Sequence, residues 1–298
     1  MAEKKMLFVV NPKAGKARIK NYLLEITDMF IKAGYEVTVY ITQDKGDALK
    51  VVKDREKRYD MIVCSGGDGT LDEVVTGMVK SGKALPIGYI PAGSTNDFAN
   101  SLKLPSNAKK AAKIVLEGEK FACDIGSFNR DVFVYVAAFG MFTDVSYGTN
   151  QELKNMLGHM AYILEGIKRL TALKSYKMKF SYGETVIEGD FLYGMITNSV
   201  SVGGFKNITG KNVALNDGQL EVTLIRRPTN ATELNKLIAA LVEQNTESEF
   251  IYWFKTAKLK VESEEKVAWT LDGEYGGEHK KVQIEDFKQA MEIIVPKI

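Results

Sequence analysis

A short apolar run that stops at a cluster of glycines constrains this chain more than any other feature. Residues 61–64 are apolar, residues 65–70 read SGGDGT, and apolar residues then recur at helical spacing as far as Val79. This pattern predicts a strand, a tight turn and a helix. Glycines can adopt positive φ and let a ligand approach the backbone, and the first N–H groups of a helix attract phosphate. Asp68 lies in this turn, and a carboxylate beside phosphate implies a divalent cation between them, which predicts Mg²⁺.

Similar units precede and follow this turn, and repeated β-α-β units predict a parallel sheet. From residue 121 the chain changes to β-rich runs separated by turns rich in Gly, Asn and Asp. The expected fold class is an α/β nucleotide-binding domain, residues 1–122, followed by an antiparallel β-sandwich domain, residues 123–286. A return of residues 287–298 to the first domain stays open. Strands are predicted at 6–10, 35–41, 86–90, 121–125, 131–139, 177–182, 189–199, 220–225, 257–262 and 267–271, and helices at 22–33, 47–57, 108–116, 151–173 and 230–244.

Composition excludes several classes of protein. The 298 residues are 45% hydrophobic and carry a formal charge of +2, so no global field favours nucleic acid. The two cysteines, Cys64 and Cys123, lie in apolar runs without metal-ligand spacing, which predicts buried free thiols in a reducing cytoplasm. The apolar run at 6–10 is too short for a signal peptide, and no run reaches the ~20 residues that span a bilayer.

Three motifs resemble those of lipid kinases. The sequence GDGT at 67–70, followed by Glu73, is similar to the nucleotide signature of diacylglycerol, sphingosine and NAD kinases and of phosphofructokinases. The sequence PAGSTNDFA at 91–99 resembles the second block of the bacterial diacylglycerol kinase and lipid kinase branch. The sequence NPKAGK at 11–16 resembles the block that opens lipid kinases. It is not a Walker P-loop, because Ala17 stands where Ser or Thr is required.

The resemblance implies ATP as phosphate donor, with Mg²⁺. Structural alternatives stay open for each block: a plain connecting turn at 11–16, a tight turn at 65–70, and Ser94 or Thr95 as caps of the following helix. The residues that the resemblance places at the nucleotide are Asn11, Pro12, Lys13, Ala14, Gly15, Thr42, Gly66, Gly67, Asp68, Gly69, Thr70, Leu71, Asp72, Glu73, Ser94 and Thr95.

Phosphoryl transfer also needs a base near the acceptor hydroxyl. Both histidines, His159 and His279, lie outside the motifs, so we expect a carboxylate. The sequence LDGE at 271–274 resembles the turn that lipid kinases bring to the nucleotide site, although Asp-Gly is also a common hairpin turn. The expected base is Asp272, with Glu274 as alternate. The other acidic residues expected in catalysis are Asp68, Asp97 and Asp124, of which Asp124 could instead brace the hinge between the domains.

A further resemblance concerns the sequence ALNDGQL at 214–220. In the family, the equivalent Asp holds a structural Mg²⁺ together with backbone carbonyls, which implies Asp217 with Ala214 and Gln219 as ligands. An Asn-Asp-Gly turn without metal is the alternative.

The expected function is therefore an ATP-dependent lipid kinase that phosphorylates the hydroxyl of diacylglycerol to give phosphatidic acid. Sphingoid bases, phosphatidylglycerol and a non-catalytic lipid- or nucleotide-binding role are the alternatives. Such an enzyme is expected in the cytoplasm and transiently on the inner face of the membrane, and a homodimer stays open. The helix predicted at 151–173 is expected to pack on the second domain, with lipid docking as the lesser alternative.

Overall fold

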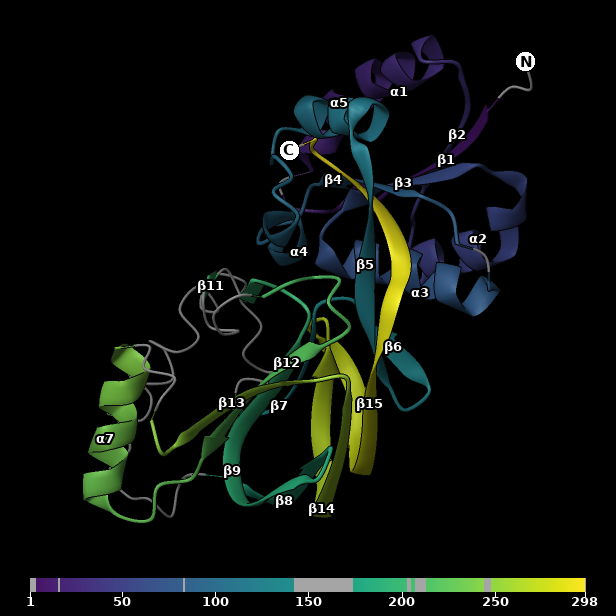
Figure 1. Ribbon diagram of the computed structural model, residues 1–298. Helices are drawn as coiled ribbons and strands as arrows, with labels where there is room; N and C mark the ends of the chain where they lie inside the picture. The colour runs from purple at the N-terminus through teal and green to yellow at the C-terminus, as the bar shows by residue number, and fades with distance from the viewer. Residues whose placement is uncertain are drawn as a thin grey trace. The chain divides into compact units, whose positions relative to one another are not determined.

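The computed structural model describes residues 4–15, 17–82, 84–141, 174–202, 205–206, 213–243 and 248–297. The chain forms two compact units: unit 1 comprises Met1–Asp124 with Lys288–Ile298, and unit 2 comprises Ile125–Phe287. The chain passes between the units within two long strands, β5 (Glu119–Phe128) and β15 (Glu274–Val295) (Figure 1). The domain limits expected from the sequence, 1–122 and 123–286, stay predictions.

Unit 1 is built on a parallel sheet with the strand order β2-β1-β3-β4-β15. Every residue of β3 and β4 is buried, which explains why these strands read as continuous apolar runs. The strands predicted at 6–10, 35–41, 61–64 and 86–90 are confirmed. Their bounds are β1 (Lys4–Val10), β2 (Tyr35–Ile41), β3 (Met61–Gly66) and β4 (Ile87–Pro91).

Helices pack on both faces of this sheet (Figure 1). On one face, Phe30 contacts Phe8 edge to face with ring centroids 5.5 Å apart, and Val115 joins the same core. On the other, Gly77 lets two helices approach closely beside Val52. The helices are η1 (Arg18–Asn21), α1 (Leu23–Lys32), α2 (Asp47–Arg55), η2 (Glu56–Arg58), α3 (Asp68–Ser81), α4 (Asp97–Ser101) and α5 (Ala108–Glu117).

Unit 2 is an antiparallel sheet with the strand order β13-β12-β9-β7-β14-β15. Strands β9 and β14 each pair with β7 near one end and with β8 near the other, so the sheet curls around its own core. The β-rich antiparallel character is therefore confirmed, but the two layers share strands instead of forming separate sheets. The remaining elements are β6 (Asp131–Phe133), β7 (Val136–Gly140), β8 (Tyr176–Tyr182), β9 (Thr185–Thr197), β10 (Ser201–Val202), β11 (Phe205–Lys206), β12 (Leu220–Arg226), α7 (Ala231–Val242), β13 (Ile251–Thr256) and β14 (Lys258–Leu271).

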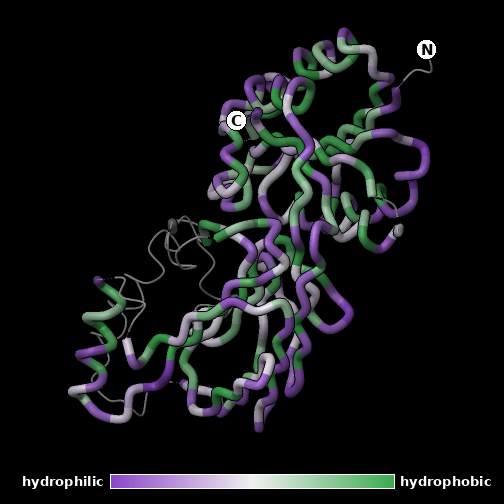
Figure 2. The backbone as a smooth tube through the Cα atoms, viewed as in Figure 1, coloured by the Kyte–Doolittle hydropathy of each residue, from purple (hydrophilic) through white to green (hydrophobic). Residues whose placement is uncertain are grey.

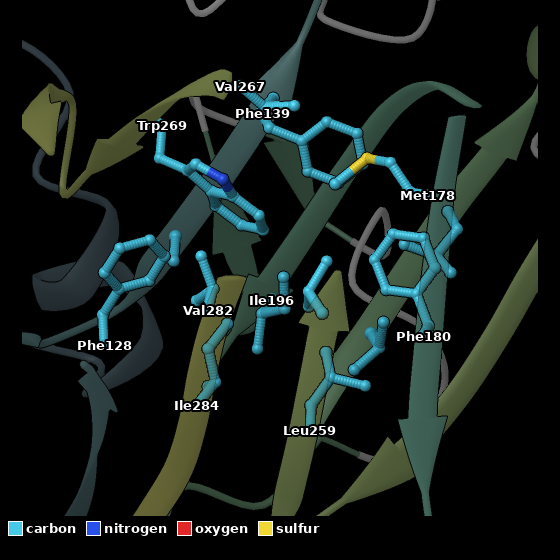
Figure 3. Close-up of a cluster of buried hydrophobic side chains, with 14 of the residues drawn as sticks. Phe128, Phe139, Met178, Phe180, Ile196, Leu259, Val267, Trp269, Val282 and Ile284 are labelled. Carbon is cyan, nitrogen blue, oxygen red and sulfur yellow. The ribbon is translucent and has the colours of Figure 1, made fainter. Parts of the chain in front are cut away.

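Aromatic side chains fill the core of unit 2 (Figure 3). The ring of Trp269 lies 4.9 Å from that of Phe139 and 5.1 Å from that of Phe128, measured between centroids. Phe139 also stacks on Phe180 at 6.0 Å. Such contacts add specificity of packing to the burial of large apolar surfaces.

Helix α7 is amphipathic, and its hydrophobic and hydrophilic residues alternate along the tube in Figure 2. Its start forms a capping box. Asn230 accepts a hydrogen bond from the N–H of Glu233, whose carboxylate accepts one from the N–H of Thr229 at 2.7 Å. The prediction of this helix is confirmed.

Several predicted elements differ from those observed. The strand expected at 131–139 is split into β6 and β7, because the N–H groups between them donate to the side chain of Asp272. The strands expected at 257–262 and 267–271 form one strand, β14, with a shift in register against β15. Strands β10, β11, β13 and β15 were not predicted. The helix expected at 151–173 lies outside the described residues.

Candidate nucleotide and catalytic site

The segments predicted to bind the nucleotide follow the parallel strands of unit 1. The chain leads from β1 outward to β2 and from β3 outward to β4, so the loops after β1 and β3 adjoin at the point where the strand order reverses. Ligands of open α/β sheets bind at this position, outside the carboxyl ends of the strands. The topology therefore places the motifs at the position where sheets of this kind bind ligands.

Hydrogen bonds hold these loops together. The N–H of Asn11 donates to the carbonyl of Ser65 at 2.8 Å, and its side-chain Nδ2 donates to Thr70 Oγ1 at 3.0 Å. The N–H of Ala92 donates to the carbonyl of Gly66 at 2.7 Å. The loops after β1, β3 and β4 thus form one pre-organised surface.

The glycines allow this close approach. A Cβ on Gly15, whose φ is +53°, would lie 2.3 Å from the carbonyl oxygen of Ala92, and a Cβ on Gly93 would lie 2.6 Å from Gly67 Cα. The positive φ expected within the turn at 65–70 is wrong: Gly66, Gly67 and Gly69 are absent from the positive-φ residues of the described chain. A Cβ on Gly66 or Gly67 would contact neighbouring atoms, so these two glycines allow close packing of the loops. A Cβ on Gly69 would have no atom within 4 Å.

The start of α3 supplies the other feature that phosphate needs. The helix begins at Asp68, and its N-cap Gly67 has no capping side chain. The first N–H groups of a helix lack acceptors within the helix and carry partial positive charge. Leu71 is buried in the core, so its predicted contact with the nucleotide is restricted to its backbone.

Asp68 also links the first and second motifs. Its Oδ2 accepts a hydrogen bond from the N–H of Asp97 at 3.0 Å, and its Oδ1 accepts one from the N–H of Phe98 at 3.3 Å. The alternative left open for Ser94 and Thr95, that one of them caps the following helix, is wrong. The N-cap of α4 is Asn96, which has φ +53° and no capping hydrogen bond. Asp68, 29 residues earlier than Asp97, instead accepts the first two N–H groups of α4.

The remaining nucleotide candidates in this unit have structural partners. Glu73 accepts hydrogen bonds from the N–H groups of Gly46 (2.7 Å) and Ala48 (3.1 Å), so it caps α2, whose N-cap has no side chain. Lys13 Nζ donates to the carbonyl of Gln43 at 3.2 Å. The buried Thr42 donates its hydroxyl to the carbonyl of Val10, and Asp72 Oδ1 accepts a hydrogen bond from the hydroxyl of Thr76. Ala14 is buried, Pro12 is half-buried, and Ser94 and Thr95 lie in the loop before α4.

Asp97 and Asp124, expected to extend the acidic network, are both buried. Asp124 Oδ1 accepts a hydrogen bond from the N–H of Gln289 at 2.6 Å, which joins β5 to β15 where both strands leave unit 1. This contact favours the alternative in which Asp124 braces the hinge between the domains. Within the described ranges, no three His, Cys, Asp or Glu side chains converge on a metal position. The acidic network expected from Asp68, Asp97 and Asp124 stays a prediction.

In unit 2, Asp272 and Gly273 form the turn between β14 and β15. Their φ angles are +49° and +85°, as in the tight hairpin turn that Asp-Gly favours. The side chain of Asp272 is 5% exposed, and it accepts hydrogen bonds from the N–H groups of Val134 (2.6 Å), Tyr135 (3.0 Å) and Val136 (2.9 Å). Glu274, the alternate base, is exposed.

The turn predicted to hold a structural metal contains an ion pair instead. Asp217 Oδ1 accepts a hydrogen bond from the N–H of Gln219, and Oδ2 accepts one from Lys255 Nζ; both are 3.1 Å. Lys255 Nζ also forms an ion pair with Glu221 Oε1 at 3.0 Å. Burial raises the pKa of Glu221 to about 7 against the opposing effect of Lys255. Ala214 is half-buried beside this turn.

Comparison with known proteins identifies the family. The model of the diacylglycerol kinase catalytic domain matches residues 5–128. Diacylglycerol kinases of Bacillus subtilis (strain 168) and Staphylococcus carnosus (strain TM300) are each 33% identical to the chain; the alignments cover 92% and 99% of this chain and 91% and 96% of theirs. The chain belongs to the diacylglycerol kinase family. It is therefore a lipid kinase, and its substrate is a lipid.

The fold agrees with this membership of the diacylglycerol kinase family. A crystal structure of a candidate diacylglycerol kinase from Bacillus anthracis strain Sterne matches with a TM-score of 0.83 at 26% identity, over 98% of this chain and 95% of that chain. As in any kinase, the donor is expected to be ATP. None of the described helices is long and apolar enough to cross a membrane. The prediction that Cys64 and Cys123 are buried free thiols is confirmed.

Sequence reasoning missed the partners of the motif carboxylates. Lys255 and Glu221 lie outside every motif, yet they form the environment of Asp217. Lys255 follows a run of four aromatic and aliphatic residues, 251–254, and a lone lysine at the end of such a run was the available signal.

Proposed function

We propose that the protein transfers the γ-phosphoryl group of ATP to the free hydroxyl of diacylglycerol, which gives ADP and phosphatidic acid. The observation that carries this proposal is the junction of the three loops around Asn11, Gly66 and Ala92 at the carboxyl edge of the sheet. The start of α3 offers N–H groups to the phosphates, and the open space at Gly69 gives them access.

Asp68 fits a role beside Mg²⁺. Oδ1 and Oδ2 of Asp68 each accept a hydrogen bond from a backbone N–H, and carboxylate oxygens are ligands that Mg²⁺ prefers. When bound with ATP, Mg²⁺ neutralises charge on the phosphates. The hydrogen bonds to Asp97 and Phe98 fix the Asp68 carboxylate in position for that purpose.

Asp272 is our proposed base, with Glu274 as alternate. The acceptor oxygen forms a bond to the γ-phosphorus, the bond from that phosphorus to the bridging oxygen of ADP breaks, and the hydroxyl proton passes to the carboxylate. Three N–H donors orient Asp272, and they also stabilise its anion, which weakens it as a proton acceptor. Glu274 is exposed, and the variants Asp272→Asn and Glu274→Gln separate the two candidates.

The choice of diacylglycerol over other hydroxylated lipids is supported by the names of the relatives. An acceptor with two acyl chains resides in a bilayer, so we propose that the enzyme reaches it at the membrane surface. Sphingoid bases and phosphatidylglycerol are the competing acceptors.

The test is to incubate purified protein with γ-labelled ATP, Mg²⁺ and mixed micelles of diacylglycerol, a sphingoid base or phosphatidylglycerol. We expect label in phosphatidic acid. The variant Asp68→Asn should lose this activity, and Asp60→Asn is its matched control. Asp60 also accepts a backbone hydrogen bond, from Lys5, but it precedes β3 whereas Asp68 follows it. Label in another lipid would change the substrate, and label in none, beside an active control kinase, would refute the proposal.

A further inference from the structure

Lys255 and Glu221 are neighbours because of the sheet register. They pair directly across β13 and β12, so their side chains project from the same face. The adjacent pair, Phe254 and Val222, lies on the opposite face and packs in the core of unit 2. The position of the ammonium group is thus set by the same pairing that builds the core.

The ammonium group lies between two carboxylates of different burial. The side chain of Glu221 is fully buried, that of Lys255 is 20% exposed, and that of Asp217 is 31% exposed. The charged form of a buried carboxylate is stabilised by a nearby positive charge. Lys255 supplies that charge to Glu221 and, through the bond to Asp217, holds the turn at 216–218 against β13.

The turn therefore does not fit the structural Mg²⁺ that the family resemblance implies. Mg²⁺ requires oxygen ligands at 2.0–2.1 Å in near-octahedral geometry. At Asp217 one oxygen already accepts the N–H of Gln219, and the other is bound by an ammonium group at 3.1 Å. A divalent ion on the same carboxylate would lie beside that ammonium group, and the two cations would repel each other.

We propose that Lys255 is the resident cation of this turn, and that the folded protein holds no structural divalent ion at Asp217. The lysine takes the role that the family resemblance assigns to the metal: it neutralises the carboxylates and joins the turn to the sheet. Unlike a metal, it cannot be removed by a chelator.

The experiment is thermal unfolding without nucleotide, so that the site in unit 1 does not contribute. The wild-type midpoint should be the same with EDTA, Mg²⁺ or Ca²⁺, and the purified protein should contain no stoichiometric divalent metal. A midpoint that falls with EDTA and recovers with Mg²⁺, or bound metal that is lost in Asp217→Ala, would overturn the proposal.

Lys255→Met tests the role of the ammonium group while keeping an unbranched apolar stem. We expect its midpoint to fall by roughly 5–10 °C and to rise again with added Ca²⁺ or Mg²⁺, because two carboxylates are left without a cation. Lys258→Met is the matched control, since Lys258 is 75% exposed and pairs with an exposed Glu285. An equal loss in both variants would refute the special role of Lys255.

If Lys255→Met does not fold, the double variant Lys255→Met with Glu221→Gln still decides the matter. Removing the buried charge along with its partner should restore folding without metal. A double variant that folds only in the presence of Mg²⁺ would argue for a metal at the turn.

Discussion

Replacing Asp272 with Asn separates the structural role of this carboxylate from its proposed role as base. Asn tolerates the positive φ of +49° at this position, and the amide matches the carboxylate in shape, so the Asp-Gly turn itself should persist. What changes is charge and hydrogen bonding. The carboxylate accepts three backbone N–H groups, whereas an amide has only one oxygen.

The geometry gives the magnitude. If the amide oxygen keeps the bonds from Tyr135 and Val136, its NH₂ group faces the N–H of Val134, which now bonds Oδ2 at 2.6 Å. Two donors then face each other at a site that is 5% exposed. Leaving a buried donor unsatisfied costs about 1–3 kcal/mol, and the lost bond is charge-assisted, so we expect the free energy of unfolding to fall by about 2–3 kcal/mol. The midpoint should fall by about 5–10 °C.

The assay combines urea unfolding, thermal unfolding and the rate of phosphoryl transfer per folded molecule. If Asp272 is the base, the rate should fall while the affinity for ATP is nearly unchanged, because an amide cannot take the acceptor's proton. Glu274→Gln is the matched control, since this exposed side chain should not affect stability. A wild-type unfolding curve for Asp272→Asn would refute the reasoning from the hydrogen bonds.

The kinetic outcomes assign the base separately from stability. A larger loss of rate in Glu274→Gln than in Asp272→Asn would give the role of base to Glu274. A loss of ATP affinity in Asp272→Asn equal to its loss of rate would place Asp272 in the nucleotide network instead.

Three further predictions concern other sites. Asp68→Asn should abolish turnover in a protein that remains folded, because α4 loses at most part of its remote cap; wild-type turnover by a correctly folded variant would remove Asp68 from the site. Gly93→Ala should weaken ATP binding and lower the unfolding midpoint, because its Cβ would lie 2.6 Å from Gly67 Cα; unchanged calorimetric ATP affinity would count against the shared loop surface. The backbone hydrogen bond from Thr229 lowers the pKa of Glu233, so this cap stabilises the protein above the ordinary pKa and the benefit disappears as pH falls through the lower folded pKa. The midpoints of the wild type and Glu233→Gln should therefore converge in acid.

The strands and helices of unit 1 were predictable where an apolar pattern runs along a continuous segment of the sequence. Residues 35–41 and 61–64 show local patterns whose meaning does not depend on distant partners. Strand β13, Ile251–Thr256, has no clean alternation, since Tyr252, Trp253 and Phe254 are all apolar although successive side chains face opposite sides. Its assignment depends on pairing with β12, which the local sequence does not contain.

The motif residues were predictable, but their partners were not. Asp272 bonds to backbone groups 136 to 138 residues earlier in the chain, and Lys255 bonds to a carboxylate 38 residues away. Such contacts follow from sheet register and loop closure. The split between β6 and β7 has the same origin, because a distant side chain accepts the N–H groups that a continuous strand would use in its ladder.

The motif carboxylates have one structural feature in common: each accepts hydrogen bonds from backbone N–H groups. The residues proposed for the chemistry therefore also stabilise the fold. Asp68 binds the N–H groups at the start of α4, and Glu73 binds those at the start of α2; neither helix has a capping side chain of its own. Asp272 binds the N–H groups of the two residues between β6 and β7 and of the first residue of β7. Backbone N–H groups are neutral donors, so they orient each carboxylate without placing an opposite charge beside it. Substitutions at these positions should therefore affect stability and turnover together, and only measurements per folded molecule can separate the two.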